Sequence, residues 1–197
     1  MIHTRALLAA AVAALAIAAG GAQAANLIVN GSFETGDFTG WTLTGDNEFT
    51  SVYGAFGGIN PEDGAYQSLW GSVSAESAMS QTFTDVSGDR YLASVWMASQ
   101  GGAPSNFGVT LDGVTRINVG PVNAQGYKDY TFNFIGTGLD TLLIYDQNKP
   151  DYNLVDNVSV TSTTAVPEPA AWGLMLIGFG SIGAALRTVR GAKTVAA

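Results

Sequence analysis

The fold of this chain is decided by the stretch Tyr91-Leu92-Ala93-Ser94-Val95-Trp96-Met97. Tyr91, Ala93, Val95 and Met97 recur in it with a period of two, which places their side chains on one face of a β-strand. The same period recurs in residues 130–134 and 157–160. We therefore expect three strands at these positions, each with one face turned to a core.

Working outward from these three, the sequence predicts further short strands between clusters of Gly, Asn, Asp and Pro. Turns such as Asp112-Gly113 and Gly136-Thr137-Gly138 separate them. Ten or so short strands with this spacing, and no 3.6-residue stripe between residues 25 and 164, predict an all-β fold: a two-sheet antiparallel jelly-roll sandwich. The further strands are expected at 26–30, 39–44, 49–53, 65–70, 77–84, 106–112, 114–119 and 140–146.

The composition excludes several classes of function. The 197 residues include no Cys, so disulfides, thiolate metal sites and cysteine nucleophiles are excluded. Residues 25–165 hold 15 acidic and four basic side chains, a formal charge of −11. A domain with that charge repels nucleic acid and other anionic polymers.

The N-terminus has the pattern of a secretory signal peptide. A short basic opening at Arg5 precedes an uncharged run from Ala6 to Ala24, which closes on Ala22-Gln23-Ala24. This order predicts a signal helix over residues 1–24 and a mature protein that begins at Ala25; a retained membrane anchor is the alternative. The chain's one His, His3, would leave with the signal peptide.

A second apolar segment lies near the C-terminus. Residues 169–186 carry no charge, and 18 helical residues span about 27 Å, enough for a single transmembrane helix. The basic tail, residues 187–193, contains Arg187, Arg190 and Lys193, which places this end in the cytoplasm by the positive-inside rule. The preceding domain, residues 25–164, must then lie outside the inner membrane.

The segment before this span resembles the PEP-CTERM sorting signal of Gram-negative bacteria. The motif lies at residues 166–169 and contains Pro167, Glu168 and Pro169, with Trp172 following at the start of the span. The whole signal covers residues 165–190. The resemblance implies transient anchoring in the inner membrane, recognition by an exosortase, and transfer to the cell surface or extracellular matrix.

A second resemblance covers residues 25–164. The opening Asn26-Leu27-Ile28-Val29-Asn30-Gly31-Ser32-Phe33-Glu34, then Gly40-Trp41, and the closing stretch 154–160 are similar to the first and last strands of galactose-binding-like jelly rolls. That superfamily includes many carbohydrate-binding modules. The resemblance implies one structural calcium ion held by Glu34 and Asp156, with a backbone carbonyl near Asn30 or Gly31. Alternatively, these two carboxylates cap turns.

Aromatic side chains are the candidate ligand-binding residues, because an aromatic face stacks on the C–H side of a sugar ring. Trp41 and Trp96 lie within motifs that resemble core strands, so we assign them to the core. Binding groups tend to lie in loops, and residues 54–61 form a Gly-rich loop; a solvated connection is its alternative reading. Trp70 is the tryptophan expected at the surface, and the candidates for binding a glycan are Tyr53, Phe56, Tyr66 and Trp70.

No catalytic centre is predicted. After removal of the signal peptide no His remains, and no G-x-S-x-G motif is present. With 15 acidic residues some pair will always match the spacing of a glycosidase, so no pair counts as evidence. The sequence thus predicts an exported, non-enzymatic protein that binds glycan or exopolysaccharide; the alternatives are a purely structural surface or matrix component and a degenerate carbohydrate-active enzyme.

Overall fold

The computed structural model describes residues 24–164 and Phe179 of the 197-residue chain. Residues Ala24–Thr164 form one compact unit. The predicted signal helix and the predicted span at 169–186 lie outside the described residues, apart from Ala24 and Phe179. In the described part, no helix is long and apolar enough to cross a membrane.

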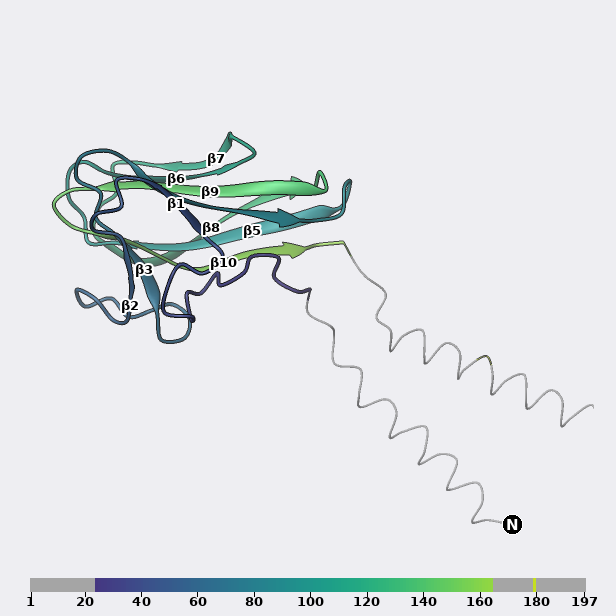
Figure 1. Cartoon of the computed structure of the whole chain (residues 1–197), viewed down its shortest axis with the longest axis horizontal. Coiled ribbons are helices and arrows are strands. Elements are labelled where there is room, and N and C mark those ends of the chain that lie inside the picture. Colours follow the sequence, from purple (N-terminus) through teal and green to yellow (C-terminus); the bar gives the residue numbers. More distant parts are fainter. Residues whose placement is uncertain (1–23, 165–178, 180–197) are drawn as a thin grey trace, which may run out of the picture. The chain divides into compact units, whose positions relative to one another are not determined.

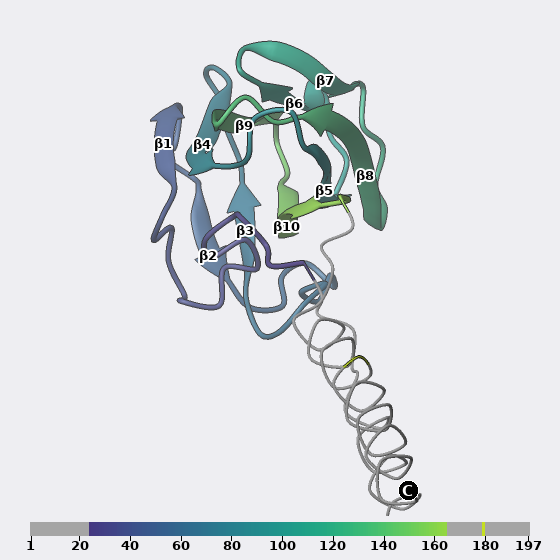
Figure 2. The ribbon, with the colours of Figure 1, turned by 90° about the vertical axis from the view of Figure 1, so that its right-hand side faces the viewer.

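Ten antiparallel strands form two five-stranded sheets that pack face to face (Figures 1 and 2). The first sheet has the order β1-β4-β9-β6-β7 and the second has the order β2-β3-β10-β5-β8. This confirms the predicted all-β, two-sheet jelly-roll sandwich. The strands are β1 Thr42–Gly45, β2 Ser51–Tyr53, β3 Gln67–Trp70, β4 Ser77–Thr84, β5 Arg90–Ser99, β6 Ser105–Leu111, β7 Val114–Val119, β8 Gln125–Ile135, β9 Leu139–Asn148 and β10 Asn153–Ser162.

The core lies between the sheets and follows the predicted alternation. Tyr91, Ala93, Val95 and Met97 of β5 are all buried. β4 and β9 alternate in the same way, and each pair of directly opposed residues has its side chains on the same face. Trp41 is also buried in this core, as expected.

The predicted first strand at 26–30 is not a strand. This segment forms turns, and Asn30 has a positive φ of 52°, which interrupts extended backbone. It is held beside β10 by the Asn26 side chain, which accepts from Val160 N–H (2.9 Å) and donates to the Val158 carbonyl (3.0 Å), and by a backbone bond from Leu27 N–H to the Val160 carbonyl (2.9 Å). The segment thus lies at the predicted place but in another conformation.

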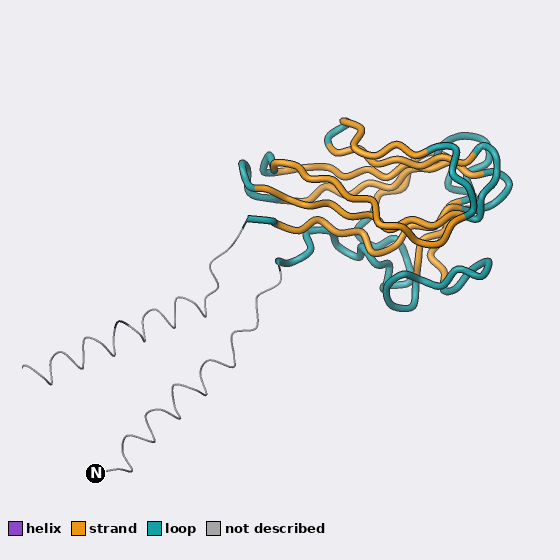
Figure 3. The backbone as a smooth tube through the Cα atoms, turned by 180° about the vertical axis from the view of Figure 1, so that it is seen from behind, coloured by secondary structure: helices purple, strands orange, loops and turns teal. Residues whose placement is uncertain are grey.

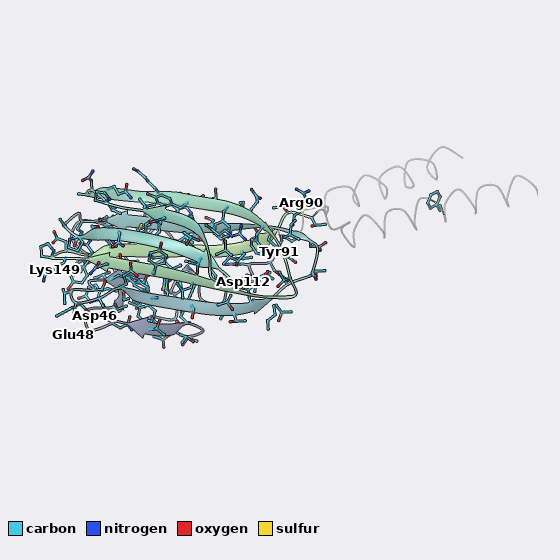
Figure 4. The ribbon with its side chains drawn as sticks, turned by 90° about the horizontal axis from the view of Figure 1, so that it is seen from above. Asp46, Glu48, Arg90, Tyr91, Asp112 and Lys149 are labelled. Carbon is cyan, nitrogen blue, oxygen red and sulfur yellow. The ribbon has the colours of Figure 1, made fainter. Side chains whose placement is uncertain are left out.

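The two ends of the sandwich differ. At one end, here the turn end, short connections join β4–β5, β6–β7 and β8–β9, and both ends of the described domain, Ala24 and Thr164, lie there (Figures 1 and 3). At the other, here the loop end, the connections are residues 46–50, 71–76, 100–104, 120–124 and 149–152. Figure 4 labels Arg90 near the turn end and Lys149, Asp46 and Glu48 at the loop end.

Candidate functional site

The connection between β2 and β3 folds over the outer face of the second sheet. Phe56 and Ile59 exchange two backbone hydrogen bonds of 2.9 Å, so residues 56–59 form a tight turn through Gly57 and Gly58. Both glycines have a positive φ, a conformation that a side chain would strain. The turn therefore presents Phe56 and Ile59 on the same side.

These two side chains cover a small second core outside the sheet. It consists of Leu69 of β3, Ala98 of β5 and Leu154 of β10, with Phe56, Ile59, Tyr127 and Tyr152 packed against it. Because β3 is covered on both faces, all four of its residues are buried. The loop is therefore built onto the sheet by apolar contacts.

The side chain of Gln67 holds this loop on the sheet by hydrogen bonds. This side chain is completely buried, and its amide nitrogen donates to the carbonyls of Gly54 (2.6 Å) and Ile59 (3.2 Å). Its amide oxygen accepts from the Tyr127 hydroxyl at 2.7 Å. Burial raises the pKa of Tyr127 well above its usual value, so this hydroxyl keeps its proton and acts as a donor.

Beside the loop is a hollow of about 410 Å³ at the loop end. The polar residues that line it include Gln100, Gln125 and Asp151, and Asp151 is the one charged residue among those that line it. Amides and a carboxylate are groups that bind hydroxyls. The remaining lining residues are Gly57, Ile59, Ser99, Ala124 and Gly126.

A row of aromatic rings lies next to this hollow. The ring centroids of Tyr53 and Phe56 lie 6.1 Å apart, and those of Phe56 and Tyr152 lie 5.0 Å apart, both in edge-to-face geometry. Tyr53 is 57% exposed at the outer end of the row. The structure thus brings together Tyr53 and Phe56, two of the four predicted ligand-binding residues.

The other two candidates lie elsewhere. Tyr66 is 40% exposed, is near Gly36, and takes part in no ring pair in the described part of the chain. The prediction that Trp70 lies at the surface is wrong: it is 0% exposed, and its indole N–H donates to Ser68 Oγ at 2.9 Å. It fills the space between the sheets, since β3 turns this side chain inward.

Trp96 was predicted to be a core residue and is only partly buried. It lies on the outer face of β5, where Asp156 of β10 and Asp129 of β8 are its direct neighbours. The alternation of β5 itself carried this signal: if Tyr91, Ala93, Val95 and Met97 face inward, Trp96 faces outward. Sequence reasoning also missed Gln100, Gln125, Asp151 and Tyr152, which have no motif of their own.

The predicted calcium ligands Glu34 and Asp156 bind the same loop from two sides. Glu34 Oε1 accepts from the N–H groups of Ala65 (2.8 Å) and Tyr66 (2.9 Å). Asp156 Oδ2 accepts from the N–H groups of Glu62 (2.7 Å) and Asp63 (3.1 Å). The two carboxylates thus hold residues 62–66 between them, which is also the turn-capping role that the sequence left open.

The third expected ligand, a carbonyl near Asn30 or Gly31, is close to β10. Gly31 O accepts from Val158 N–H at 2.8 Å, and a Cβ at Gly31 would lie 2.0 Å from Val158 O, so only glycine fits there. Among residues 24–164, no three acidic or His side chains are grouped as a metal centre. A calcium ion here would therefore need backbone and amide oxygens beside the two carboxylates.

The charge on Asp156 is unfavourable in its surroundings. Burial raises the pKa of this carboxyl to about 7, against the three backbone N–H groups that lower it, and the negative charge of Glu62 raises it further. Glu62 is held nearby, because its Oε2 accepts from the Asn157 amide at 2.7 Å. A divalent cation would relieve this repulsion, so the chemistry of these carboxylates fits calcium.

Comparison with known families identifies the C-terminal signal. Residues 165–190 match the PEP-CTERM protein-sorting motif, over the range predicted from the sequence. No curated protein matches the chain as a relative.

Solved structures similar to this chain are jelly-roll domains. One is TmCBM61, a carbohydrate-binding module in complex with β-1,4-galactotriose, which is 23% identical, with a TM-score of 0.58 over 70% of this chain and 99% of that one. The K1 cleaved adhesin domain of Lys-gingipain from Porphyromonas gingivalis is 12% identical, with a TM-score of 0.52 over 67% of this chain and 96% of that one. These likenesses show the fold of the domain, a two-sheet jelly-roll sandwich.

Proposed function

We propose that this protein is exported and binds a neutral glycan in the hollow at the loop end. The observation that carries the proposal is the hollow itself, which Gln100, Gln125 and Asp151 line next to the Tyr53–Phe56–Tyr152 row. Amide and carboxylate groups bind sugar hydroxyls, and an exposed ring stacks on the apolar face of a sugar.

Charge selects among glycans. The hollow has no basic side chain in its lining, and the domain carries a formal charge of −11. Anionic polysaccharides would be repelled, whereas uncharged ones would not. The carbohydrate-binding-module type of fold supports a glycan as the ligand, and the galactotriose in the similar structure makes β-1,4-galacto-oligosaccharides the first probes.

The proposed role is binding without catalysis. Export through the predicted signal peptide and sorting of the tail by an exosortase would place the domain at the cell surface or in the matrix, where such binding could attach it to polysaccharide. The PEP-CTERM match supports this route. Mass spectrometry of surface material from a host with an exosortase should return a chain that begins at Ala25 and lacks the residues after about Pro169.

The binding test is a neutral-glycan array probed with the full chain, followed by calorimetric titration of any positive oligosaccharide. We expect Gln100→Ala to weaken binding about tenfold, since residues at the centre of an interface contribute more than 1 kcal/mol, and Tyr53→Ala, at the outer end of the aromatic row, to weaken it less. Tyr66→Ala is the control, because it removes an exposed tyrosine ring that lies outside the row. Absence of binding on the array would leave a purely structural role.

A further inference from the structure

A buried polar cluster lies between the two sheets at the loop end. Asp146 and Asn148 of β9 point inward, as do Ser77 of β4 and Asn153 of β10, and each is at most 1% exposed. Ser77 is directly opposite Asp146 across the β4–β9 pair. These four polar side chains lie together in an interior that is mostly apolar.

The hydrogen bonds inside the cluster leave oxygens without a partner. The Asn153 amide donates to Asp146 Oδ1, and the Asn148 amide donates to Asn153 Oδ1 at 2.9 Å. Asp146 Oδ2, Asn148 Oδ1 and Ser77 Oγ are fully buried and have no hydrogen-bond partner in the described chain. An unpaired buried acceptor costs about 1–3 kcal/mol, so three in one cluster require an explanation.

The charges around Asp146 do not compensate it. Burial raises the pKa of this carboxyl to about 8, against the hydrogen bond from Asn153 that lowers it, and Glu76, just before β4, adds a further negative charge. The side chains of Ser77, Asn148 and Asn153 are neutral. In the described part of the chain, Asp146 forms no ion pair, and buried carboxylates are normally paired or bound to a metal ion.

We propose that Asp146 Oδ2, Asn148 Oδ1 and Ser77 Oγ bind a monovalent metal cation of the size of sodium between the sheets. The three atoms are hard oxygen donors, which suit an alkali or alkaline-earth ion. One carboxylate balances a single positive charge, whereas a divalent ion would leave a net charge buried. The ion joins β4 and β9 of one sheet, and through Asn153 it also joins them to β10 of the other.

The test measures the melting midpoint of the full chain at pH 9, with divalent ions chelated, in sodium chloride and in choline chloride at equal ionic strength. Choline is too large for an enclosed site, so only sodium can bind. We expect the midpoint to be higher in sodium by about 3 to 8 °C, because a ligand of the folded state alone stabilises that state. Equal midpoints in the two salts would overturn the proposal and assign the three oxygens to a water molecule or a proton.

Two variants and a direct probe complete the test. Asp146→Asn should abolish the sodium effect, and Glu48→Gln, which removes an exposed carboxylate, should keep it. If Asp146→Asn does not fold, Ser77→Ala removes one donor without changing a charge and should reduce the effect. Crystals soaked in thallium(I) should show anomalous density between Ser77, Asp146 and Asn148, and density elsewhere alone would overturn the assignment.

Discussion

The two ends of the sandwich differ in how readily the sequence predicts them. At the turn end, connections are short: Asp112 and Gly113 form a two-residue hairpin, both with positive φ (51° and 74°), as a tight turn between twisted strands requires. At the loop end, connections are longer and are held by distant residues. The candidate glycan hollow and the buried cluster around Asp146 both lie at this second end. Turn residues predict the hairpin at one end, whereas no local motif predicts the sites at the other.

The largest effect should come from the core beneath the loop end. Trp70→Ala removes a completely buried ring and a hydrogen bond to Ser68, and we expect the free energy of unfolding to fall by about 3–5 kcal/mol. Tyr53→Ala, at an exposed ring in the next strand, should change it by less than about 0.5 kcal/mol. Denaturant titration measures both, and comparable losses would show that Tyr53 is part of the core.

Calcium should have the next largest effect, if Glu34 and Asp156 share an ion that joins the first loop to the last strand. Such an ion stabilises by about 2.7 kcal/mol at a hundredfold excess over its Kd, so chelation should lower the melting midpoint by roughly 5 to 15 °C. Asp156→Asn should melt lower and respond little to added calcium. Identical midpoints in EDTA and in millimolar calcium would leave both carboxylates as caps of residues 62–66.

The hairpin at the turn end should respond to backbone strain alone. Gly113 has a positive φ and no atom within 4 Å of a Cβ built on it, so Gly113→Ala tests conformation without a steric clash. We expect a loss of about 1–2 kcal/mol in the free energy of unfolding. Gly126→Ala at the loop end is the matched control, because that position is equally open but its φ is not positive; a similar loss there would contradict the assignment to strain.

The smallest effect concerns acid stability at the loop end. Hydrogen bonds from Ser74 lower the pKa of Asp46 to about 2, with Val73 N–H as a further donor. Because the folded-state pKa is below the unfolded one, the carboxylate stabilises the fold above about pH 4, and this contribution is lost as the pH falls through 2. The melting midpoint of Asp46→Asn should therefore fall less than that of wild type between pH 5 and pH 2.5. Parallel declines would show that these contacts do not survive in solution.

The fold was predictable because apolar and polar residues alternate in the sequence wherever a strand has one buried and one exposed face. Thus β5 and β9 were recognised, and so was the turn at Asp112-Gly113. β3 has no alternation, since the core covers one face and the loop with Phe56 covers the other, and this misplaced Trp70 at the surface. The segment 26–30 carries strand-like residues, but the side chain of Asn26 supplies hydrogen bonds that a strand would draw from its backbone.

The candidate sites were predicted in part. Glu34 and Asp156 came from a resemblance, and the structure places both on residues 62–66. Asp146 lies in a strand with ordinary alternation. The sequence of that strand does not indicate that Ser77 and Asn153, which contact or face Asp146 in the interior, are also polar. That grouping depends on strand register across 69 and 7 residues of chain, which no local pattern encodes.

The contact between Asn26 and β10 has a consequence for the order in which the domain is completed during export. Asn26 is among the first residues of the domain to be synthesised, and its partners Val158 and Val160 come more than 130 residues later. β10 is also the central strand of its sheet, between β3 and β5. If the chain crosses the inner membrane N-terminus first, Asn26 cannot form these contacts until β10 has also crossed. The sandwich is then completed only when the sorting signal, which starts at residue 165, reaches the membrane.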